Sequence, residues 1–72
     1  MRARISTPLD REMRHQGRQA QWLAAAVGVH ESQISRWRSG MHVPEKATRE
    51  KIARALGRTP DDLWPEPERE VA

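Results

Sequence analysis

Gly28 stands between two short segments with apolar residues at helical spacing, and this arrangement most restricts what the chain can fold into. Before the glycine, Leu23 and Val27 lie four residues apart and therefore share one face of a helix. After it, Ile34 and Trp37 lie three apart on the inner face of a second helix. A glycine can adopt the left-handed backbone that stops the first helix and turns the chain. The spacing predicts two short helices joined by a tight turn.

The second of these helices carries a polar outer face. The motif covers residues 20–39, with helices over about 19–27 and about 31–38. The side chains left pointing outward from the second helix are Glu31, Ser32, Gln33, Ser35, Arg36 and Arg38. Two crossing helices with such a face are typical of a helix-turn-helix unit, whose second helix can enter a DNA major groove. The pattern therefore predicts DNA binding.

The size and residue types of the chain exclude several other kinds of protein. A chain of 72 residues can form one small domain with a modest core. It contains no cysteine, which excludes a disulfide framework, a thiolate zinc site and a thiol nucleophile. No apolar run approaches the roughly 18–20 residues of a membrane span, and the basic start lacks the apolar stretch of a secretory signal. We therefore expect a soluble cytoplasmic protein with no membrane partner.

The net charge of +3 is unevenly distributed along the chain. Residues 1–40 carry +4, residues 41–58 carry +3 and residues 59–72 carry −4. A basic globular part suits a polyanion such as DNA, although many small domains carry similar charge without binding nucleic acid. The predicted organisation is a basic N-terminal arm over 1–6, a helix-turn-helix DNA-binding domain over 7–64 and a disordered acidic Pro/Glu tail over 65–72.

Start and stop signals outline three further helices. A Thr-Pro pair at residues 7–8 predicts an N-cap followed by proline at the first helical position, and Gly17 ends that helix. Pro44 is predicted to open another helix, which Gly57 stops. A second Thr-Pro pair at residues 59–60 begins a short last helix. We expect an all-α fold of five short helices around one core.

Cap and core positions follow from the same signals. Asp10 lies three residues after Thr7, which is the spacing of a capping box. His30 precedes the second helix of the motif, where Ser or Thr would be the stronger cap. Trp22 is expected to pack over Leu9 or Met13, with a partner-facing position as the alternative. The residues expected inside are Leu9, Met13, Leu23, Ala24, Val27, Val29, Ile34, Trp37, Ala47 or Thr48, Ile52, Ala55, Leu56, Leu63 and Trp64.

These elements, in this order, resemble the phage lambda repressor and Cro-like helix-turn-helix family, also called XRE-type. The resemblance covers roughly residues 8–64, and segment 26–37 is also similar to the phage lambda CII activator. It is carried by Leu23-Ala24, Ala26-Val27-Gly28-Val29, Ile34-Ser35-Arg36-Trp37, Gly40, Pro44 and Ile52-Ala53-Arg54-Ala55-Leu56-Gly57. Two positions depart from the family. Ala20 stands where the family often has a phosphate-binding Gln, and Trp22 stands where it usually has a polar residue.

The resemblance implies a lambda repressor-like DNA-binding domain that docks its second motif helix in the major groove, N-terminal end first. The implied base-reading residues are Glu31, Ser32, Gln33 and Arg36. Gln33 could bridge adenine and Arg36 could grip guanine, whereas Glu31 either accepts from cytosine or stabilises the helix N-terminus. The candidates for phosphate binding are Arg18, Gln19, Gln21, Ser35, Arg38 and His42.

The leading hypothesis is a phage-like, repressor-type transcription regulator that occupies an operator on double-stranded DNA as a homodimer. Val43, Leu63 and Trp64 are candidates for the dimer surface. The alternative is a protein-interaction module, such as an antitoxin or an RNA polymerase anchor, in which Trp22, Trp64 and the acidic tail matter more than Arg36.

We expect neither a metal site nor an enzyme. The three histidines lie in separate predicted elements without pair spacing, and neither a nucleophile elbow nor a glycine-rich phosphate loop is present. No cofactor and no small-molecule substrate are expected either.

Overall fold

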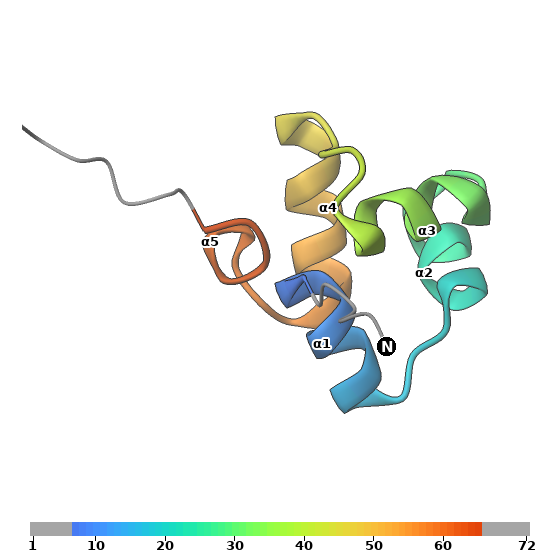
Figure 1. The fold of residues 1–72 in the computed structure, drawn as a ribbon, viewed down its shortest axis with the longest axis horizontal. Coiled ribbons are helices and arrows are strands. Elements are labelled where there is room, and N and C mark those ends of the chain that lie inside the picture. The colour runs from blue at the N-terminus through green and yellow to red at the C-terminus, as the bar shows by residue number, and fades with distance from the viewer. Residues whose placement is uncertain (1–6, 66–72) are drawn as a thin grey trace, which may run out of the picture.

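The computed structural model describes residues 7–65, which form five helices (Figure 1). The helices are α1 (Pro8–Gln16), α2 (Ala20–Val27), α3 (Glu31–Ser39), α4 (Lys46–Leu56) and α5 (Pro60–Leu63). The described part of the chain contains no strand, so the predicted all-α class with five helices is confirmed. Within residues 7–65, every helix is too short or too polar to cross a bilayer. The proposed arm over 1–6 and most of the proposed tail lie outside the described residues.

Thr-Pro pairs begin α1 and α5, as predicted. The hydroxyl of Thr7 accepts a hydrogen bond from the amide of Asp10 at 3.0 Å, and that of Thr59 accepts from the amide of Asp62 at 3.3 Å. At α5 the Asp62 carboxylate also accepts from the Thr59 amide at 3.0 Å, which completes a capping box. The same box predicted at Asp10 is wrong, because the carboxylate there binds two arginines instead.

The start predicted for α4 is also wrong. Pro44 does not open the helix: Glu45 is the N-cap residue and the first helical residue is Lys46. The proline ring is buried in the α3–α4 connection, and its carbonyl oxygen accepts a hydrogen bond from Nη1 of Arg49 at 2.8 Å. The proline therefore packs the connection against the domain and leaves the first turn of the helix to the residues that follow.

Ten hydrophobic side chains form one core among the described residues. Its members are Leu9, Met13, Leu23, Ala24, Ile34, Trp37, Ile52, Ala53, Leu56 and Leu63. Partly buried around them are Ala20, Trp22, Val27, Val29, Ala55 and Trp64. The burial of Ala53 was not predicted. Because α4 contacts both α2 and α5, it buries a wider face than the single stripe of apolar residues expected from its sequence. Ala47, one of two alternatives predicted as core, is exposed, whereas Thr48 is half-buried.

The hinge at Gly28 is confirmed. Its φ of 84° lies in the left-handed region, and its amide donates to the carbonyl oxygen of Ala24 at 2.8 Å. The next amide, that of Val29, donates to the same oxygen at 3.0 Å, so the chain turns within two residues. As a result α2 and α3 pack directly on each other, while α4 supports α2 and α1 supports α3 (Figure 1).

Candidate nucleic-acid interface

The outer face of α3 is polar and open to solvent. Ile34 and Trp37 are 0% and 9% exposed and hold the helix on the domain. The exposed residues of the helix include Glu31, Ser32, Gln33, Ser35 and Arg36. Ser32 and Arg36 are four residues apart and therefore lie one above the other on the same face. Among residues 7–65, no side-chain hydrogen bond or ion pair engages the guanidinium of Arg36. The four candidate base-reading residues thus all come from the start and middle of one helix.

The N-terminus of α3 is closed by a histidine. Nδ1 of His30 accepts a hydrogen bond from the amide of Ser32 at 3.0 Å. In return the amide of His30 donates to Oε1 of Gln33 at 3.4 Å, which forms a capping box. The helix therefore begins at Glu31, as predicted, although its cap is neither Ser nor Thr. Gln33 is therefore both a base-reading candidate and part of the helix cap. Its side-chain oxygen Oε1 accepts the cap hydrogen bond, and its side-chain nitrogen Nε2 remains free to donate.

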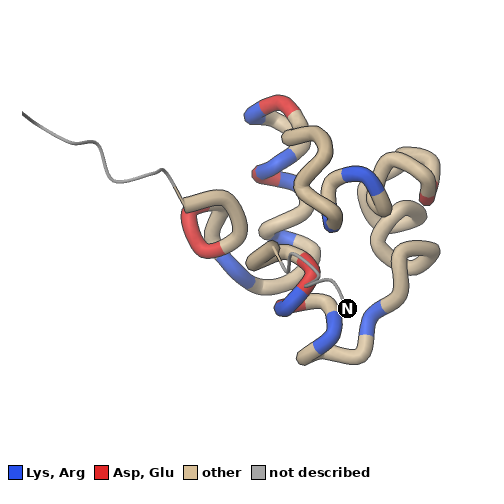
Figure 2. The backbone as a smooth tube through the Cα atoms, in the orientation of Figure 1, with Lys and Arg blue, Asp and Glu red and all other residues tan. Residues whose placement is uncertain are grey.

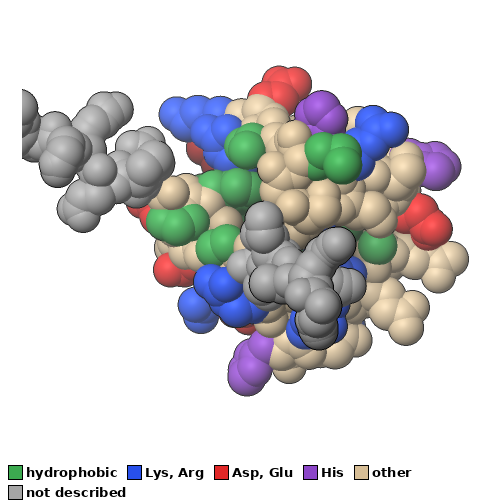
Figure 3. All heavy atoms as spheres, in the orientation of Figure 1, with side chains coloured by type: hydrophobic (Ala, Val, Ile, Leu, Met, Phe, Trp, Pro, Cys, Tyr) green, Lys and Arg blue, Asp and Glu red, His purple; other side chains and the backbone are tan. Residues whose placement is uncertain are grey.

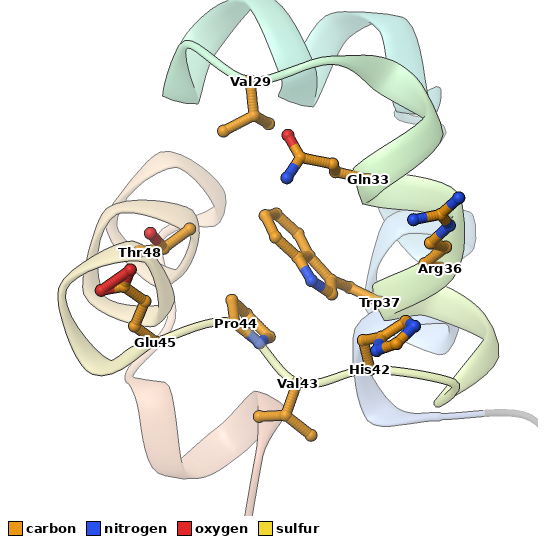
Figure 4. A pocket seen from close by; sticks show the side chains of 9 residues that line it. All are labelled: Val29, Gln33, Arg36, Trp37, His42, Val43, Pro44, Glu45 and Thr48. Atoms are coloured by element: carbon orange, nitrogen blue, oxygen red, sulfur yellow. The ribbon is translucent and has the colours of Figure 1, made fainter.

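A hollow of about 510 Å³ lies between α3 and the start of α4 (Figure 4). The indole of Trp37 stands at its centre, and the amide nitrogen of Gln33 points toward the ring (Figure 4). The guanidinium of Arg36 points away from the hollow, outward from α3 (Figure 4). His42, the phosphate-binding candidate on the α3–α4 connection, is exposed and also lines the hollow. The two principal base-reading candidates thus point in different directions from one helix.

Three of the phosphate-binding candidates come together at the α1–α2 turn. Gln19 is the N-cap residue of α2 but makes no side-chain cap hydrogen bond, and Gln21 is exposed. The guanidinium of Arg18 lies over the ring of Trp22, 4.2 Å from the ring centroid. These residues line a second hollow of about 350 Å³. The turn therefore gathers a cation and two amides at the positive end of a helix dipole, which favours an anion.

Trp22 is half-buried and packs against the core. Packing against the core was predicted, whereas the specific contact with Leu9 or Met13 stays a prediction; the ring also supports the Arg18 guanidinium. Sequence reasoning missed this stacking, because Arg18 precedes α2 and its position over Trp22 depends on the conformation of the α1–α2 turn.

Arg38 is not placed with the other candidates. Its Nε and Nη2 atoms donate to Oδ1 of Asp10 at 2.8 and 2.7 Å, and its side chain is 20% exposed. Nε of Arg14 donates to Oδ2 of the same carboxylate at 2.8 Å. Burial alone raises the pKa of Asp10, but the hydrogen bonds from Arg14 and Arg38 outweigh it and hold that pKa below its usual range. Sequence reasoning missed the ion pair of Asp10 with Arg38, because Arg38 lies on another helix.

The described helices differ in the sign of the charges that they carry. Figure 2 shows basic residues in the C-terminal half of α3 and at the α1–α2 turn, acidic residues on α5 and at the start of α3, and residues of both signs on α1 and α4. In Figure 3 side chains of His and of Lys or Arg stand out along the edge formed by α3. Across residues 7–65, no cluster of three or more His, Asp or Glu side chains is placed to hold a metal ion. The arrangement suits a polyanion that approaches from the α2–α3 side.

A family model described as Helix-turn-helix matches residues 10–63 of the chain. The match runs from α1 to the end of α5 and includes the hinge and the outer face of α3. Neither a curated protein nor a solved structure matches the chain. The separate similarity of segment 26–37 to the phage lambda CII activator is not addressed by this match and stays a prediction.

Proposed function

Because this chain belongs to the XRE-type helix-turn-helix family of DNA-binding regulators, we propose that it binds a specific operator by inserting α3 into the major groove. The observation that carries the proposal is the open polar face of α3, held outward by the burial of Ile34 and Trp37. Occupying an operator in this way would regulate transcription from the neighbouring promoter.

Arg36 is the residue on which we expect specificity to depend most. Its guanidinium points away from the domain and carries the planar fork of donors that matches O6 and N7 of guanine (Figure 4). Gln33 would read adenine through its amide, and this contact requires its oxygen to leave a cap hydrogen bond that is long, at 3.4 Å. Ser32 lies one turn before Arg36 on the same face, and Glu31 precedes it at the helix start.

The phosphate contacts are proposed to start at the α1–α2 turn. Arg18 would meet one phosphate while its ring contact with Trp22 limits the number of positions that the guanidinium can adopt. Gln19 and Gln21 would donate to the same stretch of backbone, which compensates for the alanine at position 20. Ser35, Arg38 and His42 complete the set, with Arg38 donating through Nη1, since Asp10 holds its other two nitrogens.

A homodimer on a two-fold symmetric operator is proposed as the binding form. One recognition helix covers few base pairs, and helix-turn-helix dimers place two half-sites about 34–36 Å apart. Val43 is 62% exposed and Trp64 is half-buried, so both could contact a second copy. Leu63 cannot, because it is 2% exposed and belongs to the core.

The alternative of a protein-interaction module has less support. It relied on Trp22 facing a partner, but this ring packs against the core and lies beneath Arg18. Trp64, the second feature on which it relied, is half-buried and also packs against the core. The third, the acidic tail, lies outside the described residues except for Pro65.

Selection from a random duplex library, followed by fluorescence anisotropy on the selected sequence, tests the DNA-binding proposal. Wild type should prefer the selected site over random DNA by at least roughly 10³-fold. The variant Arg36→Ala should lose roughly 1–3 kcal/mol of discrimination at one base pair. Arg54→Ala is the control, because Arg54 is an exposed cation on α4 outside the proposed contacts. Failure of wild type to bind any duplex at low salt would contradict the proposal.

A further inference from the structure

We infer that His30 is a further DNA-contacting residue, which caps α3 through Nδ1 and presents Nε2–H as a hydrogen-bond donor to an acceptor atom of the DNA. The inference rests on the proposed function, because it places this donor at the end of α3 that enters the groove first. His30 is absent from the residues that the sequence suggested as DNA contacts, since a histidine at a cap position is an ambiguous signal.

The protonation of the ring follows from the cap hydrogen bond. The amide of Ser32 can only donate, and it lies 3.0 Å from Nδ1 of His30. A ring nitrogen that accepts a hydrogen bond carries no proton, so the proton of the neutral imidazole is on Nε2. The helix cap therefore selects one tautomer of the ring and leaves a defined donor on its other nitrogen.

The Ser32 side chain takes part in the same arrangement. Its hydroxyl oxygen lies 2.9 Å from Nδ1. Because Nδ1 is an acceptor here, the hydroxyl can only donate to it, sharing the single lone pair of Nδ1 with the Ser32 amide, and the lone pairs of the hydroxyl oxygen stay free. His30 thus offers a donor, and the neighbouring hydroxyl offers an acceptor.

The location of this pair suits a contact with DNA. His30 is exposed and directly precedes Glu31, the first residue of α3. Among the described residues, its ring contacts by hydrogen bond only Ser32, and it does so through Nδ1. Nε2–H is therefore uncommitted, at the helix end from which side chains of this kind of motif reach base edges. The matching acceptors on DNA are N7 or O6 of guanine, N7 of adenine and the phosphate oxygens.

Two substitutions separate the cap from the DNA contact. In His30→Asn the side-chain oxygen can take the place of Nδ1, and asparagine is among the best N-cap residues, but the side chain does not reach as far as Nε2. In His30→Ala both the cap and the donor are lost. Thermal unfolding followed by circular dichroism should give His30→Asn a melting temperature close to that of wild type and His30→Ala a lower one.

The binding measurement uses the duplex selected with wild-type protein and its single-base-pair variants. We expect His30→Asn to bind the selected duplex roughly 3- to 10-fold more weakly, the effect of one uncharged hydrogen bond. A loss confined to one base pair assigns the contact to a base edge, and a loss that is equal on all duplexes assigns it to a phosphate. Equal binding by wild type and His30→Asn would overturn the inference alone, whereas failure of wild type to bind any duplex would overturn the proposed function as well.

The tautomer can be measured without DNA. Long-range ¹⁵N–¹H correlation spectra of the free protein at neutral pH should show His30 with an unprotonated Nδ1 and a protonated Nε2. His15 and His42, which are exposed and have no hydrogen bonds to their rings within residues 7–65, serve as internal references. A proton on Nδ1 of His30 would overturn the inference, whatever the binding results.

Discussion

The carboxylate of Asp10 on α1 accepts two hydrogen bonds from the guanidinium of Arg38 near the C-terminal end of α3, although the two residues are 28 positions apart. Beside this ion pair, the hydroxyl of Thr7 donates to the backbone carbonyl of Arg38 at 2.7 Å. α1 therefore holds one end of α3, and His30 caps the other. The polar face proposed to read DNA is thus carried by a helix whose two ends are both fixed.

Replacing Asp10 by Asn should reduce the free energy of unfolding by about 1–2 kcal/mol. The loss should exceed that of a typical exposed ion pair, because the side chain of Arg38 is only 20% exposed and would lose its counter-charge. Urea denaturation followed by circular dichroism measures it. Glu50→Gln on α4 makes the same change in net charge at an exposed site. Equal losses in the two variants would contradict a specific role for the pair.

The contribution of Asp10 should also depend on pH. Burial raises the pKa of its carboxyl, but the hydrogen bonds from Arg14 and Arg38 prevail, so its folded pKa lies below the ordinary value. A depressed folded pKa stabilises the fold above the unfolded pKa of about 3.9, and this stability is lost as the pH falls through the folded pKa.

The melting temperatures of wild type and Asp10→Asn should therefore differ by a constant amount near neutral pH and converge below about pH 4. The pKa of Asp62, which hydrogen bonds from the backbone and side chain of Thr59 also lower, contributes equally to both proteins. A difference that persists undiminished in the most acidic samples would contradict this account.

Alanine at the two glycines that flank α3 should have unequal effects. At Gly28, where φ is 84°, an added Cβ meets no atom within 4 Å, so only backbone strain of about 1–2 kcal/mol is expected. At Gly40, where φ is 82°, the same Cβ would lie 3.3 Å from Cγ2 of Thr7. Gly40→Ala should therefore destabilise more, since it also disturbs the contact between Thr7 and Arg38. Thermal unfolding of both variants tests this order.

Arg18→Gln should weaken binding to the operator and to unrelated duplexes by the same factor. The guanidinium is proposed to meet a phosphate, so its loss should lower the slope of log K against log salt by about 1. Anisotropy titrations at several salt concentrations measure the slope. Arg54→Gln removes one positive charge from an exposed position on α4 and should leave the slope nearly unchanged. If both variants change the slope equally, the proposed contact between Arg18 and a phosphate is contradicted.

Gln33→Glu should keep the fold and change the preferred operator. Glutamate is favoured at this position of a capping box, so the hydrogen bond to the amide of His30 is retained. The amide donor is lost, and a negative charge enters the groove, so recognition of adenine should fail at one position. Gln33→Ala should lose both the cap and the recognition. Library selection shows the change in sequence preference, and melting temperatures show the difference in stability.

Several features of the fold could be predicted because they depend on residues close together in the chain. The glycines that end α1 to α4 all have positive φ, and the Thr-Pro pairs begin α1 and α5 as expected. Each of these signals acts through hydrogen bonds or backbone sterics within about four residues. The buried stripe of Ile34 and Trp37 was predictable for the same reason, since helical periodicity alone places both on one face.

The features that were missed involve a partner on another helix or on a distant part of the chain. Pro44 was expected to open α4, but it is buried in a connection whose position depends on the rest of the domain. Leu63 was expected in the core and is buried there, but it was also a candidate for a dimer surface, which the contacts of α5 with α1 and α4 exclude. How wide a face a helix buries depends on how many other helices pack against it, and this cannot be read from the local sequence.

The amino-acid sequence alone determined the helices, their turns and the polar residues that α3 presents, because propensity, capping and periodicity operate over a single turn. Tertiary structure decided which of those polar residues form ion pairs within the protein and which stay open to solvent. It pairs Arg38 with Asp10 and leaves Arg36 without a side-chain partner among the described residues. Two arginines two positions apart point in different directions from a helix, and only the packing of α1 against α3 brings a carboxylate to one of them.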